Sequence, residues 1–182
     1  MRLQRAYIRQ ARDDPAGALE DIEKSLEAQK AREASSRPHL RSVMAVFLLV
    51  ELGRLEQART LADEVVDRHP WLGFPEFALV AADVGYLSKL RAALDALSRR
   101  RPPDIAAEAI IEGRFVEAAD VLAEMGRMTA AARVRLRAAE TLAEQGHRTE
   151  ANEQLDKALA FYRSVGATRY IREAEALVAA TA

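Results

Sequence analysis

The sequence predicts an all-α protein, a right-handed α–α superhelix of about five helical hairpins followed by a closing helix. Apolar residues recur with the 3.6-residue period of helices, and aromatic residues make up only 5% of the chain. A six-residue pattern, Gly-x-x-x-Glu/Gln-Ala, opens three amphipathic stretches, at Gly53 to Ala58, Gly113 to Ala118 and Gly146 to Ala151. Because helical units repeated on this scale cannot bury their apolar faces alone, we expect them to stack.

Glycine, proline and polar residues divide the first half of the chain into three hairpins. Asp14 is placed to cap a helix, because it directly precedes Pro15 at the first helical position. Gly53 separates the helices of the second hairpin, and His69-Pro70 ends it. The predicted helices cover residues 2–12 and 15–33, then 38–52 and 55–68, then 75–84 and 86–99.

The second half is predicted to hold two more hairpins and a single last helix. Three arginines, followed by Pro102-Pro103-Asp104, separate it from the first half. The last helix has no second helix with which to form a hairpin, and such a single helix typically covers the exposed end of a helical stack. We expect one repeat domain over residues 1–182, in which these last helices cover 105–112 and 114–125, 128–145 and 148–165, and 168–180.

The repeat extends beyond the six-residue pattern. With each glycine counted as position zero, the residue at +5 is alanine and those at +9 and +12 are apolar in all three copies. A small residue at +5 lets two helices approach closely, while the residues at +9 and +12 fill the seam between them. Two weaker copies start at Asp13 and at Gly85.

On this pattern the chain resembles the tetratricopeptide-repeat (TPR) superfamily over most of its length. It departs from that family in the first helix of each hairpin, where Ser42, Pro102 and Arg135 replace an early aromatic residue. The stretch 158–177 is similar to the C-terminal end of large bacterial LuxR-type signalling proteins, which join a nucleotide cyclase or a DNA-binding module to a regulatory ATPase and then to such repeats. The resemblance implies a TPR-like solenoid that holds or senses a partner.

Sequence motifs for catalysis are not found. The chain has no glycine-rich phosphate loop, no His-Glu-x-x-His helix and no cysteine, and its three histidines, His39, His69 and His147, lie far apart. We therefore expect no enzyme activity, no cofactor and no metal site. The net charge of −1 argues against nucleic acid as a partner. No apolar run is long enough to span a bilayer, so we expect a cytoplasmic protein that does not bind membranes.

A set of charged residues is the first candidate for partner binding. In the family alignment, Arg100, Arg133 and Glu140 map to the concave side of the repeats, and Arg137 shares a helix face with Arg133. Guanidinium groups there would suit carboxylate or phosphate groups on a partner segment. The alternative is a solvated face with ion pairs inside the helix.

An apolar set is the second candidate. Tyr7, Val43 and Phe47 map to the same concave side, and the alternative is that they are ordinary core. An aromatic and apolar cluster, which we expect to fill an irregular junction between hairpins, consists of Trp71, Leu72, Phe74 and Phe77.

These features together indicate a non-enzymatic scaffold that binds a partner protein or peptide in a concave groove. Two alternatives stay open: a regulatory or sensor fragment of a larger bacterial signalling ATPase or transcriptional regulator, and a self-associating structural protein. Self-association would use the N-terminal end, where we expect an uncovered flank carrying Leu3, Ala6, Tyr7 and Ile8. This flank would either form a homodimer or dock onto another polypeptide.

Overall fold

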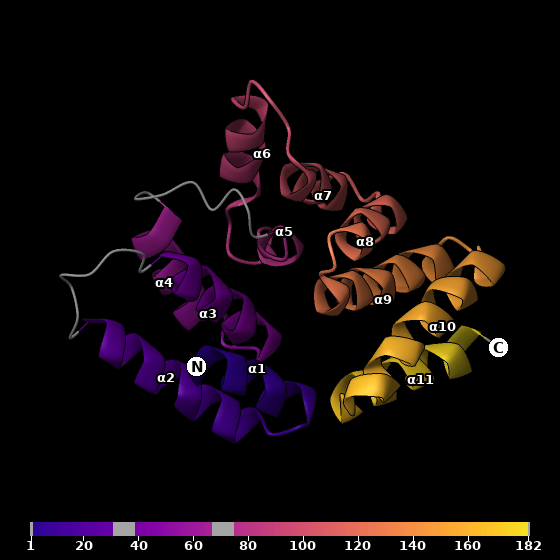
Figure 1. Ribbon diagram of the computed structural model, residues 1–182, viewed down its shortest axis with the longest axis horizontal. Helices are drawn as coiled ribbons and strands as arrows, with labels where there is room; N and C mark the ends of the chain where they lie inside the picture. Colours follow the sequence, from indigo (N-terminus) through magenta and orange to yellow (C-terminus); the bar gives the residue numbers. More distant parts are fainter. Residues whose placement is uncertain (1, 31–38, 67–74, 182) are drawn as a thin grey trace. The chain divides into compact units, whose positions relative to one another are not determined.

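The computed structural model describes residues 2–30, 39–66 and 75–181 (Figure 1). Within these ranges the regular secondary structure consists of eleven α-helices and contains no strand, which confirms the all-α prediction. The chain groups into two compact units, Met1–Leu97 and Ser98–Ala182. A superhelical arrangement and a single repeat domain stay predictions.

The first unit contains six helices, and the first four form two hairpins. Helix α1 packs on α2 and α3 packs on α4, while α1 and α5 also contact α3. Its core contains Ala6, Ile22, Val46 and Leu48, which come from three different helices. The helices are α1 (Arg2–Ala11), α2 (Pro15–Lys30), α3 (His39–Glu51), α4 (Leu55–Val66), α5 (Phe77–Val80) and α6 (Leu87–Asp95).

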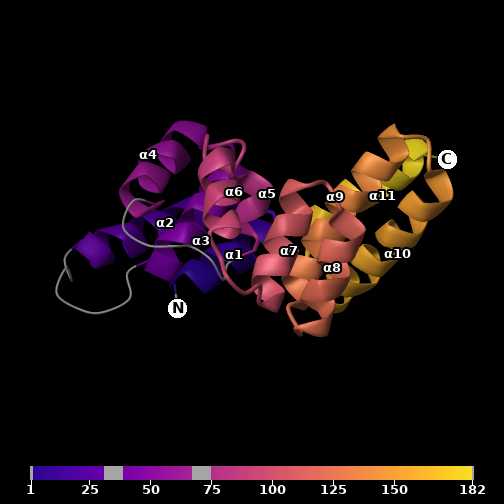
Figure 2. The ribbon, with the colours of Figure 1, turned by 90° about the horizontal axis from the view of Figure 1, so that it is seen from above.

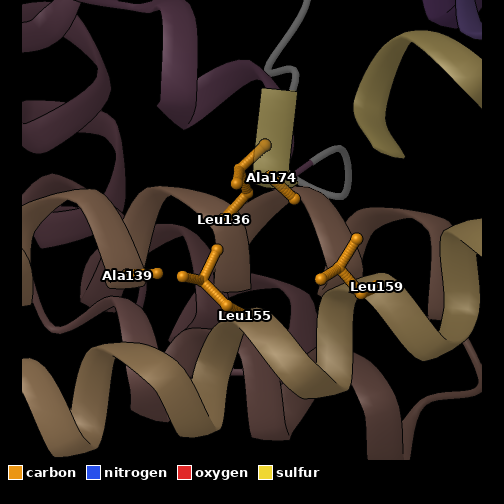
Figure 3. Close-up of a cluster of buried hydrophobic side chains, with 5 residues drawn as sticks. All are labelled: Leu136, Ala139, Leu155, Leu159 and Ala174. Atoms are coloured by element: carbon orange, nitrogen blue, oxygen red, sulfur yellow. The ribbon is translucent and has the colours of Figure 1, made fainter. Parts of the chain in front are cut away.

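In the second unit each helix packs on the next helix in the chain, and α11 also contacts α9 (Figure 2). Figure 3 shows a buried cluster in which Leu136 and Ala139 of α9 meet Leu155 and Leu159 of α10 and Ala174 of α11. The five helices are α7 (Pro102–Ile111), α8 (Phe115–Glu124), α9 (Met128–Glu144), α10 (Arg148–Val165) and α11 (Thr168–Thr181).

One turn geometry recurs at seven places in the described residues. At each of these seven turns a residue with positive φ follows the helical segment; it is glycine at six of them and Asp13, with φ 66°, at the first. At Gly113 the N–H donates to the Ile110 carbonyl at 3.1 Å, and the following N–H donates to the Ala109 carbonyl at 2.8 Å. The same pair of bonds occurs at all seven turns and satisfies carbonyls at the helix end. Asp13 therefore replaces glycine in the first copy of the repeat.

Burial follows the predicted repeat phase. Alanine at +5 is fully buried in the three strong copies, and so are the three +9 residues, Ala62, Leu122 and Leu155. The weaker copies behave alike, since the corresponding Ala18, Ile22, Leu90 and Leu94 are buried. At +12, Ala158 is buried and Met125 is half-buried, whereas the Val65 side chain lies outside the described residues. The spacing of the repeat was therefore predicted correctly at +5 and +9.

Capping explains where α2 and α7 begin. The Asp14 carboxylate accepts the Gly17 N–H at 2.9 Å, which confirms it as an N-cap. Helix α7 begins at Pro102 rather than at the predicted residue 105. Proline is tolerated in a first turn, and the Asp104 carboxylate accepts the Arg101 N–H at 3.0 Å, so the prolines open the helix instead of separating it from the preceding segment.

The segment after residue 75 differs most from the prediction. A helix was expected over 75–84, but α5 is only four residues long and is followed by turns up to Gly85. In the aromatic and apolar cluster, Phe77 is buried in α5. Its other three members, the predicted helix end at His69-Pro70 and the segment 31–38 lie outside the described residues.

Candidate interaction site

The surface of the second unit is hollowed between α8 and α9. This α8–α9 groove has a volume of about 660 Å³ and is open to solvent. Residues of the turn before α8 and of the two helices line it. The lining residues are Gly113, Arg114, Phe115, Val116, Glu117, Asp120, Val121, Glu124, Ala138, Thr141, Leu142 and Gln145.

Apolar side chains form much of the lining. Ala138 is buried, while Phe115, Val121 and Leu142 are half-buried. Val116 is 37% exposed and is one of the most exposed large apolar residues in the described part of the chain. A partner that covered these side chains would gain apolar burial without any unfolding of the unit.

Three exposed carboxylates, Glu117, Asp120 and Glu124, lie on the α8 side of the groove, against a single lining cation. That cation, Arg114, is bound by Glu117 and by Glu112, whose Oε2 lies 2.6 Å from Nη2. These hydrogen bonds raise the pKa of Arg114 above its usual value, so its charge is already compensated. The groove therefore has a negative balance of charge.

The predicted arginine set is distributed over separate ion pairs. Arg100 pairs with Glu108 at 3.2 Å, and Arg137 pairs with Glu140 of its own helix at 2.9 Å. Arg133 pairs with Glu173 of α11 at 3.3 Å. The Arg137 pair matches the alternative of a solvated face, since its guanidinium-bearing side chain is 60% exposed. Partner binding by these four residues stays a prediction.

Arg133 has a structural role that the sequence did not indicate. Its side chain is only 18% exposed, and its guanidinium lies 5.0 Å from the centre of the Tyr170 ring on α11. The Tyr170 ring in turn stacks on Tyr162 of α10, with centroids 5.0 Å apart. Arg133 therefore helps to attach the last helix to the unit.

Charge reversal should distinguish the roles of the two arginines of α9, Arg133 and Arg137. We expect Arg133→Glu to lower the free energy of unfolding by about 1–2 kcal/mol, because it opposes Glu173 and loses the Tyr170 ring. The matched change Arg137→Glu should cost less than about 0.5 kcal/mol, because that pair is exposed. Urea denaturation measures both variants. Equal losses would contradict the structural role of Arg133.

The apolar set lies in the first unit and is largely covered. Val43 and Phe47 are 3% and 2% exposed, and the Tyr7 ring stacks on Phe47 with centroids 6.4 Å apart. This placement is that of core side chains joining α1 to α3. A partner-binding role for the three stays a prediction, and it would require the two helices to separate.

The expected apolar flank at the N-terminus is mostly covered. Leu3 and Ala6 are buried, because α2 and α3 pack on α1, so the expectation that Leu3 faces outward is wrong. Tyr7 is half-buried, and only Ile8, at 51%, is strongly exposed among these four residues. Homodimer formation through this end stays a prediction.

Two buried carboxylates hold arginines instead of facing a cavity. Asp21 of α2 accepts Arg5 Nε at 2.7 Å and lies 3.2 Å from Arg9 Nη1, both on α1. The hydrogen bond from Arg5 outweighs burial and lowers the pKa of Asp21. Burial alone would raise the pKa of Asp104, but hydrogen bonds from Arg101 lower it overall. Both acids are therefore ionised at neutral pH and stabilise local structure.

Neither a metal site nor a membrane span is found in the described residues. They contain no group of three or more histidine, aspartate or glutamate side chains placed to hold a metal ion. Their helices also fall short of the combined length and apolarity needed to cross a bilayer.

The α8–α9 groove was not predicted. Its signal in the sequence is the spacing of glycines: Gly113 and Gly126 enclose a short helix, whereas Gly126 and Gly146 enclose a long one. Unequal lengths leave part of the longer helix uncovered on the side of the shorter one, which is a sequence signal for a hollow at this place. Gly126 was not recognised as a repeat position, because the six-residue pattern is incomplete after it.

No protein-family model, curated protein or solved structure matches this chain. The resemblance to TPR proteins therefore depends on the repeated turn and on the residues buried in phase with it.

Proposed function

We propose that this chain is a non-enzymatic, TPR-like interaction module that binds a segment of a partner protein. The observation that carries the proposal is the repetition of one helix–turn–helix unit, with the same turn and the same buried +5 and +9 positions. Repeated helical units of this kind stack into solenoids whose extended surfaces bind partners.

The distribution of charged groups supports binding rather than chemistry. Of the acids buried most deeply, Asp21 binds arginines that join α1 to α2, and Asp104 binds Arg101 at the start of its own helix. In the second unit, Arg133 joins α9 to α11 in the same way. Because these charges are used in ion pairs within the fold, the exposed faces of the helices are the surfaces that a partner could bind.

The α8–α9 groove is a candidate surface for this binding. It combines partly exposed apolar side chains with acidic groups along one wall, and such a combination is typical of surfaces that receive amphipathic segments. The resemblance of residues 158–177 to the end of bacterial signalling proteins suggests a regulatory partner in the cytoplasm.

Affinity capture from the native host tests the proposed function. The immobilised chain should retain a defined protein that an unrelated helical protein of similar net charge does not retain, and mass spectrometry identifies it. Titration calorimetry with that purified protein should then give saturable binding, and a segment of it should reproduce the affinity. No saturable binding by any retained protein would reject the proposal.

Sedimentation of the isolated chain tests the self-associating alternative. The exposed Ile8 is the observation that favours it. A dimer that persists on dilution and is abolished by Ile8→Glu would support self-association as the function. A monomer at high concentration would exclude it.

A further inference from the structure

The α8–α9 groove arises from a mismatch in helix length. Helix α8 has 10 residues, whereas α9 has 17. At 1.5 Å per residue, α9 is longer by about 10 Å. The two helices are adjacent and antiparallel across the turn at Gly126, so the C-terminal part of α9 extends past the start of α8. The lining residues Thr141 and Leu142 come from this part of α9, and Gln145 is its C-cap.

The chemistry of the groove differs between its two walls. The α9 wall is uncharged, with Ala138, Thr141, Leu142 and Gln145. On the α8 wall the acids fall at positions 117, 120 and 124, a spacing that places them along one side of a helix. Glu117 is paired with Arg114, and Asp120 lies 3.0 Å from Arg135 Nη2 of α9, whereas Glu124 has no ion-pair partner in the described part of the chain. An occupant must therefore be apolar on one side and basic on another.

We propose that the α8–α9 groove binds a basic amphipathic helix of a partner protein, an inference that rests on the proposed function and identifies its partner class. Apolar side chains of that helix would cover Val116, Val121 and Leu142. Its lysines or arginines would meet the carboxylates of α8, where Glu124 offers an uncompensated charge. A volume of about 660 Å³ accommodates a few anchor side chains rather than a whole domain.

Charge complementarity favours this occupant over a second copy of the chain. The lining carries three carboxylates against one arginine, so an identical groove brought against it would add repulsion. The C-terminal end of α9, with Gln145 in the lining, adds the negative end of a helix dipole.

A pair of synthetic peptides tests the inference. The first peptide is a helix of about 15 residues with leucine on one face and lysine on the other, a length at which isolated helices are marginally stable. In the second, glutamate replaces every lysine. Fluorescence anisotropy with the full chain should show about tenfold tighter binding of the lysine peptide, and its affinity should fall as salt rises.

Matched variants locate the binding. Glu124→Lys should lower the affinity for the lysine peptide about fivefold or more. Glu153→Lys, at an exposed position of α10 outside the lining, should leave this affinity unchanged. Val116→Ser should also lower the affinity for the lysine peptide, whereas Val165→Ser, at another exposed valine, should not. Circular dichroism confirms that all four variants fold.

Three results would overturn the inference: equal affinity for the two peptides, equal effects of Glu124→Lys and Glu153→Lys, or a dimer in sedimentation that Glu124→Lys disrupts. The last result would make a second copy the occupant. Failure here is distinct from failure of the proposed function. If the protein retained by affinity capture binds Glu124→Lys and Val116→Ser as well as the wild type, the module binds a partner elsewhere and only the groove assignment fails.

Discussion

Replacing Ala118 by arginine should destabilise the second unit by about 3 kcal/mol or more. Ala118 is the fully buried +5 residue of α8, which packs on both α7 and α9. A long charged side chain has no space at such a position, so the helices must separate or the charge must lose its hydration. Hydrogen exchange should show lost protection in peptides from α7, α8 and α9.

Ala160→Arg is the matched control for this change. Ala160 is exposed on α10, so the same substitution should alter the free energy of unfolding by no more than about 0.5 kcal/mol. An unchanged urea midpoint in Ala118→Arg would contradict the claim that the helices pack closely against each other at the +5 position.

Truncating Phe47 to alanine should lower the free energy of unfolding by about 3–5 kcal/mol, because its ring is buried between α1 and α3 and stacks on Tyr7. Phe47→Leu should cost less, since it keeps most of the volume. Urea denaturation measures both, and Ile8→Ala, at an exposed apolar position of α1, should change little.

Phe47→Ala also distinguishes a role of Phe47 in the core from a role in partner binding. A side chain that serves in docking would, when truncated, weaken partner binding in calorimetry with little loss of stability. That outcome would contradict the core placement and restore Tyr7, Val43 and Phe47 as a binding surface.

The local parts of the fold could be predicted from the sequence. Positions +5 and +9 after each glycine are determined by the geometry of one turn and the following helix, so their burial is encoded within about ten residues. The N-cap at Asp14 was readable for the same reason. Helix starts were less certain, as at Pro102, because proline can either precede a helix or open it.

Burial and pairing that depend on distant segments could not be predicted. Leu3 is covered because α2 and α3 both pack on α1, and nothing near Leu3 in the sequence indicates the contact with α3. The partner of Arg133 is Glu173, forty residues further along the chain, so the arginine was interpreted as a surface group. The groove likewise depends on the relative lengths of two neighbouring helices rather than on any single motif.

The succession of packed neighbours in the second unit has a consequence for how this part of the protein forms. Each helix there packs mainly on a helix that is adjacent to it in the chain, through a turn of a few residues. Contact order is therefore low, and closing each hairpin costs little loop entropy. A nascent chain leaving the ribosome could pair α7 with α8 while α11 is still being synthesised, so that folding keeps pace with translation.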